Sequence, residues 1–151
     1  MSLKLTVVTA QRTVLEMDGV TKLVVPAADG QITILPNHAA LMSSLAIGEM
    51  VVFTGTGTGS ESIAIHGGFI QVANDEVSVL ADAAERIEQI DLDRAEAARA
   101  RAQARLQGRD VDLVGGMDVL RAQLSLQRSL TRLRVARRRA GGATGVPSSR
   151  P

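Results

Sequence analysis

The amino-acid sequence predicts an α+β protein, with an N-terminal antiparallel β-sandwich followed by a C-terminal antiparallel helical hairpin. Over residues 1–85, apolar and polar residues alternate and glycine interrupts the runs, as in short strands with one buried face. Over residues 86–151, Ala, Arg and Leu predominate, which favours helices. The charge changes at the same place: the first segment holds 3 basic and 9 acidic residues (net −6), and the second holds 14 basic and 7 acidic residues (net +7).

These changes divide the chain into two domains and a tail. We expect the sandwich to span residues 1–86 and the helical hairpin to span residues 87–139. Residues 140–151 are rich in Gly, Pro and Ser and have no apolar period, so this tail is expected to be disordered.

The composition limits the chemistry that the chain can perform. No cysteine is present, which excludes disulfides and thiolate chemistry and fits a reducing compartment. Only two residues are aromatic, Phe53 and Phe69, so Val, Ile, Leu and Ala must fill the core. No apolar run approaches the roughly 18 residues of a membrane span. The N-terminus leads directly into an alternating pattern, so no signal peptide is expected.

The predicted strands are short and closely spaced, which is typical of a sandwich or barrel. They are expected at residues 3–7, 13–17, 20–25, 32–34, 45–47, 50–53, 63–65, 69–72 and 77–80. Pro36 is expected to end the fourth of these strands, because proline lacks the N–H that a strand ladder needs. The residues after it, 37–41, are predicted to form an ordered loop.

Turn residues separate these strands. Asp18-Gly19 is predicted to be a hairpin turn because glycine tolerates positive φ, and Ala28-Asp29-Gly30 and Asn74-Asp75 are predicted to be further turns. Gly67-Gly68 interrupts a strand pattern that resumes at once, which indicates a bulge or a close backbone contact. Residues 55–59 alternate Gly and Thr but lack the Lys-Ser/Thr pair and the following helix of a phosphate-binding loop, so a plain flexible hairpin is expected there.

Two helices are predicted after the strands. Asp91 is a good N-cap for the first helix, and Gly108 is a natural residue to end it. The second helix is predicted from about residue 117 to about residue 139, after a connecting loop. The expected buried stripes are Ala95, Ala98, Ala102 and Leu106 on the first helix and Leu126, Leu130 and Leu133 on the second. A two-helix hairpin buries little surface, so its stability should be marginal.

The sequence offers little that could form an active site. The only histidines, His38 and His66, have no carboxylate at ligand spacing, so no metal site is expected and a structural role is favoured for His66. Neighbouring acidic residues, such as Asp91 and Asp93 or Asp75 and Glu76, are explained by a helix cap and a turn rather than by a catalytic pair.

The placement of the arginines is the sequence feature that most suggests a binding site. Arg94, Arg101 and Arg105 lie on one face of the first helix, and Arg121, Arg128 and Arg132 repeat the same spacing on the second. The simplest interpretation is two solvated basic faces. The alternative is that both rows converge on an anion such as a phosphate chain, since facing guanidinium groups repel each other unless something negative lies between them. Nucleic acid is a third interpretation, weakened by the absence of Tyr and Trp and by the acidic first domain.

Four sequence blocks occur together and in order. They are residues 30–41 (Gly-Gln-Ile-Thr-Ile-Leu-Pro-Asn-His-Ala-Ala-Leu), Gly67-Gly68-Phe69, residues 77–84 leading to Glu85, and residues 132–136 (Arg-Leu-Arg-Val-Ala). No single block is specific, but the set resembles the epsilon subunit of F-type ATP synthase. The resemblance covers residues 3–136.

The resemblance implies a sandwich at the foot of the central stalk that contacts the gamma subunit and the ring of c subunits. The expected stalk-contact loop is Pro36, Asn37 and His38. Such a subunit performs no chemistry and couples proton-driven rotation to ATP synthesis. Its hairpin either lies folded or extends along gamma towards the alpha and beta subunits, where it inhibits ATP hydrolysis. The expected location is peripheral, at the cytoplasmic face of the bacterial inner membrane, with membrane contact only through the complex.

The resemblance also implies a regulatory nucleotide site, because some bacterial members bind ATP through the motif Ile/Leu-Asp-x-x-Arg-Ala. That motif is complete here at residues 90–95. The implied site residues are Glu85, Ile90, Asp91, Arg94, Ala95, Arg101, Arg128 and Arg132. ATP binding varies across the family, so ATP is expected as an optional regulatory ligand, and no cofactor is required.

Two features depart from the family pattern. Residues 111–116, between the helices, are longer and richer in glycine than usual, which affects the register of the arginines on the two helices. The basic tail after Arg137 is additional. The competing hypothesis is a stand-alone adaptor or nucleic-acid-binding module with a basic helical arm, whereas the stalk hypothesis predicts no nucleic-acid partner.

Overall fold

The structure, a computed structural model, describes residues 1–55, 59–108 and 116–143. The chain forms two compact units, residues 1–86 and residues 87–151. Among its described residues, the first unit contains seven strands: β1 (Leu3–Val8), β2 (Thr13–Ala27), β3 (Gly30–Ile34), β4 (Leu41–Thr54), β5 (Ser60–Ala73), β6 (Glu76–Ala81) and β7 (Ala84–Arg86). The second contains a 3₁₀ turn, η1 (Ile87–Gln89), and two helices, α1 (Leu92–Leu106) and α2 (Gly116–Ala143).

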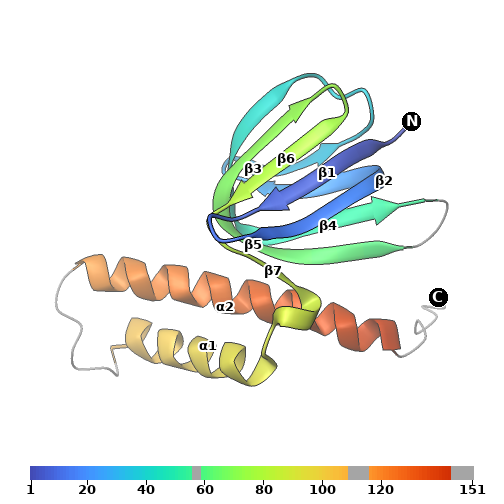
Figure 1. Ribbon diagram of the computed structural model, residues 1–151. Helices are drawn as coiled ribbons and strands as arrows, with labels where there is room; N and C mark the ends of the chain where they lie inside the picture. Colours follow the sequence, from blue (N-terminus) through green and yellow to red (C-terminus); the bar gives the residue numbers. More distant parts are fainter. Residues whose placement is uncertain (56–58, 109–115, 144–151) are drawn as a thin grey trace, which may run out of the picture. The chain divides into compact units, whose positions relative to one another are not determined.

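The seven strands of the first unit form one sheet that closes on itself (Figure 1). The strand order is β1-β6-β5-β4-β2-β3, and β1 also pairs with β2, which closes the ring. The short β7 pairs with β5 outside this path. Every pairing is antiparallel except that of β1 with β6, which is parallel. The predicted fold class, a β-sandwich followed by two helices, is confirmed.

The core of the sandwich consists almost entirely of aliphatic side chains. Its largest fully buried members are Leu3, Leu5, Leu23, Ile34, Met50, Ile63, Ile65 and Ile70, with Val7, Val20, Val25 and Val52. Neither phenylalanine belongs to this core. Phe53 lies under the ammonium group of Lys22, 4.1 Å from its ring centroid, and Phe69 is 59% exposed. Alternating aliphatic residues therefore build the core without aromatic help, as the composition predicted.

The hairpin turn predicted at Asp18-Gly19 is wrong. Strand β2 runs through this point without a break and pairs with β1 on both sides of it. Leu3 of β1 pairs with Val20, and Leu5 pairs with Met17, so three residue steps on β2 match two on β1. This is a β-bulge, and Gly19 adopts φ +71° in it. The sequence signal for a tight turn was in fact a signal for positive φ, which bulges and turns share.

The other two predicted turns, at residues 28–30 and 74–75, connect strands. Ala28 and Asp29 connect β2 to β3, with Ala27 paired to Gly30. Asn74 and Asp75 both have positive φ, at 51° and 60°, which is the requirement of a type I′ hairpin turn. The strands predicted separately at residues 45–47 and 50–53 are one strand, because β4 continues through Gly48 over 14 residues. Residues 56–58 of the predicted flexible hairpin lie outside the described residues.

Helix α1 begins and ends close to the predicted residues. Asp91 caps its N-terminus, and Gly108, with φ +71°, follows the C-cap Gln107. Of its predicted stripe, Ala95 and Ala102 are buried, and the other two residues are half-buried. These small side chains let α2 approach closely.

Helix α2 differs from the prediction in its stripe. Leu133 is buried and Leu126 is half-buried, but Leu130 is 42% exposed. The side chains buried beside Leu133 on the same face are Ala122, Ser129 and Ala136. The α-helical period allows either set, and the pairing of small residues with the alanine face of α1 selects the second.

The predicted disorder of the tail is wrong at its start. Helix α2 continues to Ala143, through the first four residues of the segment predicted to be disordered. Once a helix has formed, each further residue adds a hydrogen bond, so a glycine pair costing only about 1 kcal/mol per residue need not end it. Residues 144–151 of the predicted tail, and residues 109–115 of the predicted connecting loop, lie outside the described residues.

Candidate functional site

The segment that carries the predicted nucleotide motif also starts helix α1. The backbone N–H of Arg94 donates a hydrogen bond of 3.1 Å to Oδ1 of Asp91, whose backbone is extended, as in an N-cap. Ile90 and Ala95 are buried, at 7% and 3% exposed. Asp91 therefore has a role in helix formation, and Ile90 and Ala95 have a role in packing. The side chain of Arg94 is exposed, so it is open to a ligand.

The predicted arginines lie on one side of the helical hairpin. Figure 1 shows α1 and α2 side by side and antiparallel. Arg94 and Arg101 lie about a quarter of a turn or slightly more from the buried Ala95 stripe, and Arg128 lies about a quarter of a turn from buried Ser129. Arg132 falls beside Arg128. Because the helices run in opposite directions, these rotations bring both pairs to the same side.

The register of the helices brings three of these arginines to one level. Arg99 of α1 lines a pocket together with Leu130 and Leu133 of α2, which fixes the parts of the helices that lie opposite each other. Arg101, two residues farther along α1, is therefore level with the α2 segment that carries Arg128 and Arg132. Arg94 lies farther towards the C-terminal part of α2. The Arg101 side chain is exposed, and those of Arg128 and Arg132 are half-buried.

Glu85, the remaining predicted nucleotide residue, belongs to β7 of the sandwich unit. Its Oε1 lies 2.9 Å from Nε2 of His66, whose side chain is 2% exposed. Next to it, Arg86 forms an ion pair with Glu61, with Nη2 2.7 Å from Oε1. Sequence reasoning found no carboxylate near His66, because the partner lies 19 residues away and is brought in only by the pairing of β7 with β5.

A polar cluster that was not predicted from the sequence lies beside this pair. Glu49 of β4 pairs directly with Ala64 of β5, which pairs in turn with Glu85 of β7, so the three side chains share one face of the sheet. The hydroxyl of Ser62, on the same face, donates a hydrogen bond of 2.7 Å to Glu49. Glu49 is 9% exposed and Ser62 is 2% exposed. The only sequence signal was Glu49 inside residues 45–53, which are otherwise apolar or glycine.

The predicted stalk-contact loop is held by a hydrogen bond to the turn between β5 and β6. Asn37 has φ 63°, and its backbone N–H donates a hydrogen bond of 2.6 Å to Oδ1 of Asp75. The backbone N–H of His38 donates to the carbonyl of Leu35 at 3.1 Å. This loop and the Asn74-Asp75 turn border a hollow of about 330 Å³. A loop that a scaffold positions in this way is suited to docking.

An exposed apolar row crosses the outer face of the sandwich. Phe69 of β5 pairs with Leu80 of β6, and Leu80 pairs with Val8 of β1. Phe69 and Leu80 are 59% and 52% exposed, and Met42, diagonal to Phe69 on β4, is 71% exposed. The neighbours Ile70 and Val79 point into the core. Large side chains on the outward positions of strands are the signal in the sequence that could have revealed this row.

Two features are absent from the described residues. Within residues 1–55, 59–108 and 116–143, no group of three or more His, Asp or Glu side chains could hold a metal ion. Over the same part of the chain, neither helix is both long enough and apolar enough to cross a membrane.

A closed β-sandwich followed by a two-helix hairpin defines the class of this protein. The chain matches the family described as "ATP synthase, Delta/Epsilon chain, beta-sandwich domain" over residues 2–87 and the "long alpha-helix domain" of the same family over residues 88–137. The chain therefore belongs to the ATP synthase delta/epsilon chain family.

The relatives agree with this assignment. The ATP synthase epsilon chain of Desulfitobacterium hafniense is 47% identical over 115 residues, which are 76% of this chain and 82% of the relative. That of Dehalococcoides mccartyi is 42% identical over 137 residues, or 91% of this chain and 94% of the relative. A chain in the mitochondrial ATP synthase of Euglena gracilis (OSCP, F1 and c-ring) shares the fold, with a TM-score of 0.73, 22% identity, and coverage of 89% of this chain and 81% of that one.

Proposed function

We propose that this chain is a non-catalytic subunit of the central stalk of an F-type ATP synthase. In this role the sandwich binds the gamma subunit and the c-ring and couples proton-driven rotation to ATP synthesis. The chain then lies peripherally at the cytoplasmic face of the bacterial inner membrane and contacts the membrane only through the complex. The observation that carries the proposal is the exposed apolar row on the sandwich.

Phe69, Leu80 and Met42 support a protein partner for this face. Each is more than half exposed, and the strand register makes them neighbours. Exposed apolar groups that gather in this way mark interaction sites, and exposed aromatic residues are enriched among interface anchors. We assign gamma to this row, because a subunit that turns with the stalk needs a stable, desolvated interface with the shaft.

The loop of Pro36, Asn37 and His38 is the proposed contact with the c-ring. The hydrogen bond from Asn37 to Asp75 holds the loop in one conformation, so little ordering entropy is lost on docking. Residues on loops that a rigid scaffold positions are common binding residues.

The helical hairpin is the proposed inhibitor of ATP hydrolysis. The second segment of the chain carries a net charge of +7, from 14 basic and 7 acidic residues. This charge suits an extended helix that reaches acidic surfaces on the alpha and beta subunits, since complementary charge speeds association and selects partners. In the folded state the helices pack on each other, so the equilibrium between the two states sets the degree of inhibition.

ATP is the proposed optional ligand of the folded hairpin. Arg101, Arg128 and Arg132 lie at one level on one side of the helix pair, and guanidinium groups bind phosphate through paired N–H donors. A ligand that binds only the folded hairpin stabilises that state and so relieves inhibition. Asp91 caps α1 through the backbone N–H of Arg94, and the exposed Arg94 side chain is a further proposed phosphate contact.

Co-purification tests the stalk assignment. The full chain, produced together with the other ATP synthase subunits of its source, should recover gamma and c subunits. Phe69→Ser should weaken recovery of gamma, whereas Leu92→Ser, which removes an apolar side chain of similar exposure on α1, should not. Recovery of nucleic acid instead, with a steep salt dependence, would support the competing adaptor or nucleic-acid-binding module.

An ATPase assay tests the inhibitory role. A chain truncated after Glu88 keeps the sandwich and its core, so it should assemble normally but raise ATP hydrolysis by the complex. Assembly without any change in hydrolysis would remove the inhibitory role and leave the stalk assignment standing.

Calorimetry tests the nucleotide site on the isolated full chain. Arg94→Ala should weaken ATP binding, whereas Arg12→Ala, which removes the same charge from an exposed position in the sandwich, should not. Absence of ATP binding by the unaltered protein at millimolar concentration would refute the nucleotide proposal alone.

A further inference from the structure

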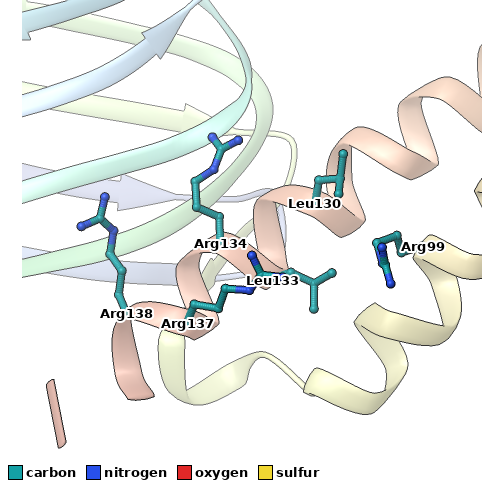
Figure 2. A pocket seen from close by; sticks show the side chains of 6 residues that line it. All are labelled: Arg99, Leu130, Leu133, Arg134, Arg137 and Arg138. Carbon is teal, nitrogen blue, oxygen red and sulfur yellow. The ribbon is translucent and has the colours of Figure 1, made fainter. Parts of the chain in front are cut away.

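The other side of the helical hairpin carries a second cluster of arginines (Figure 2). A pocket of about 300 Å³ lies there, between α1 and the C-terminal half of α2. Its lining is Arg99, Leu130, Leu133, Arg134, Arg137 and Arg138. None of these residues belongs to the predicted nucleotide motif or to the arginine rows that flank it.

Helix geometry separates this arginine pocket from the nucleotide row. Taking Ser129 as the centre of the face buried against α1, Arg128 lies about a quarter of a turn to one side. Arg137 lies about a quarter of a turn to the other side. The two clusters therefore occupy opposite sides of the helix pair, and one ligand cannot contact both.

Two guanidinium groups of the pocket have no partner among the described residues. Arg99 forms an ion pair with Glu96, with Nη2 3.0 Å from Oε2. Arg134 and Arg137 are exposed, and no hydrogen bond or ion pair links either to another residue in the part of the chain that the structure describes. Spaced three residues apart, their like charges repel each other on the helix. They also lie more than one turn before Ala143, beyond the range at which a helix C-terminus stabilises cations.

The apolar floor of the pocket strengthens any contact between its arginines and an anion. Leu133 is 3% exposed and Leu130 is 42% exposed, so the arginines share the pocket lining with a partly buried, apolar surface. Figure 2 shows Arg99 and Arg137 on either side of Leu133, one from each helix. In such surroundings a hydrogen bond to a charged group is stronger than in water. The pocket volume lies at the low end of the range for small-molecule sites.

We propose that this arginine pocket binds a compact oligophosphate, of the size of pyrophosphate or tripolyphosphate. Two or three linked phosphates supply the negative charge and the paired acceptor oxygens that Arg99, Arg134 and Arg137 can share. Bound there, the anion bridges α1 and α2 and stabilises the packed hairpin. A nucleotide could enter only through its phosphate chain, with its base outside. This inference does not depend on the proposed ATP site.

Titration calorimetry of the full chain with tripolyphosphate at low ionic strength tests this proposal. The unaltered protein should bind, and the pocket variant Arg134→Gln/Arg137→Gln should lose one equivalent of binding or show at least about tenfold weaker affinity. The control Lys4→Gln/Arg12→Gln, with the same charge loss on the sandwich, should bind like the unaltered protein. Tripolyphosphate should also raise the melting temperature of the helices, but not in the pocket variant.

Three results would overturn the proposal. They are the absence of binding at millimolar tripolyphosphate, an equal loss in the pocket variant and the control, and loss only in Arg128→Gln/Arg132→Gln. The last result would assign the anion to the nucleotide row and would leave the proposed ATP site standing. If the pocket variant still binds ATP much more tightly than tripolyphosphate, this result would also assign the anion to the nucleotide row. Matching circular dichroism spectra show that the variants are folded.

Discussion

His66 and Glu85 join two strands of the sandwich through a contact of 2.9 Å between Nε2 and Oε1. His66 lies on β5 and Glu85 on β7, the last strand before the helices. The other ring nitrogen of His66, Nδ1, is buried and has no hydrogen-bond partner among the described residues. With Glu85 ionised, Nε2 is therefore the protonated nitrogen that donates. This contact and the neighbouring pair of Arg86 with Glu61 both join the short strand β7 to β5.

Removing the imidazole should destabilise the sandwich. His66→Ala leaves a cavity and removes a hydrogen-bond partner from the half-buried carboxylate of Glu85, so the free energy of unfolding should fall by about 2–3 kcal/mol. Urea denaturation followed by circular dichroism measures this change. Glu16→Gln breaks the exposed ion pair of Glu16 with Lys4, 4.0 Å apart, and should change it by less than about 1 kcal/mol. Equal effects of the two substitutions would contradict a structural role for the His66 contact.

Gly68 should tolerate no side chain. Its φ is +122°, and a Cβ there would overlap the carbonyl oxygen of Leu80 and lie 2.7 Å from Cα of Ala81. Both obstacles are backbone atoms of the paired strand β6, which cannot move aside without breaking the ladder. Gly68→Ala should therefore cost more than about 3 kcal/mol of stability or prevent folding.

Gly19→Ala is the matched control for the Gly68 substitution. Gly19 also has positive φ, +71°, but a Cβ there would meet no atom within 4 Å. Gly19→Ala should therefore lower the stability only by the conformational cost of positive φ, about 1–2 kcal/mol. Denaturation midpoints measured side by side test this order, and a Gly68→Ala protein as stable as Gly19→Ala would refute the close contact.

Features determined by local chemistry could be predicted from the sequence. The cap at Asp91, the end at Gly108 and the turn at Asn74-Asp75 each depend on one or two residues and on neighbours close in the chain. The alternating pattern likewise predicted the aliphatic core. The bulge at Gly19 was mistaken for a hairpin, because positive φ is a local requirement whereas strand continuation depends on pairing with distant β1.

Features that depend on packing could not be predicted in the same way. Strand β7 has only three residues and no period to detect, so the His66–Glu85 contact was hidden. Within each helix the period predicts which arginines share a face. Which faces meet depends on the choice of Ala122 and Ser129, rather than Leu130, as the packing stripe of α2. The arginine pocket arises from that choice and from the register that brings Arg99 opposite Leu133.

The contribution of the Asp91 cap to the stability of α1 should be measurable, because the helical hairpin is small. Asp91→Ala removes the acceptor of the Arg94 N–H, so the stability of the helical unit should fall by about 1 kcal/mol. Asp91→Asn keeps a side-chain acceptor and should melt close to the unaltered protein. Thermal melting followed by far-ultraviolet circular dichroism separates the two. If both variants melt alike, Asp91 does not act as the cap.

Close packing of the two helices should control the balance between folded and extended hairpin. Ala102 is 2% exposed at the contact with α2, so Ala102→Leu should push the helices apart at a cost of about 1–3 kcal/mol. Ala100→Leu adds the same side chain on the exposed face and should change stability by less than about 0.5 kcal/mol. Without a ligand, the equilibrium between folded and extended hairpin shifts by the full change that the substitution makes in the free-energy difference between these two states. If the extended hairpin is the inhibitory form, Ala102→Leu should therefore lower ATP hydrolysis by the assembled complex, while Ala100→Leu leaves it unchanged. Lower helix stability without any change in hydrolysis would separate hairpin packing from inhibition.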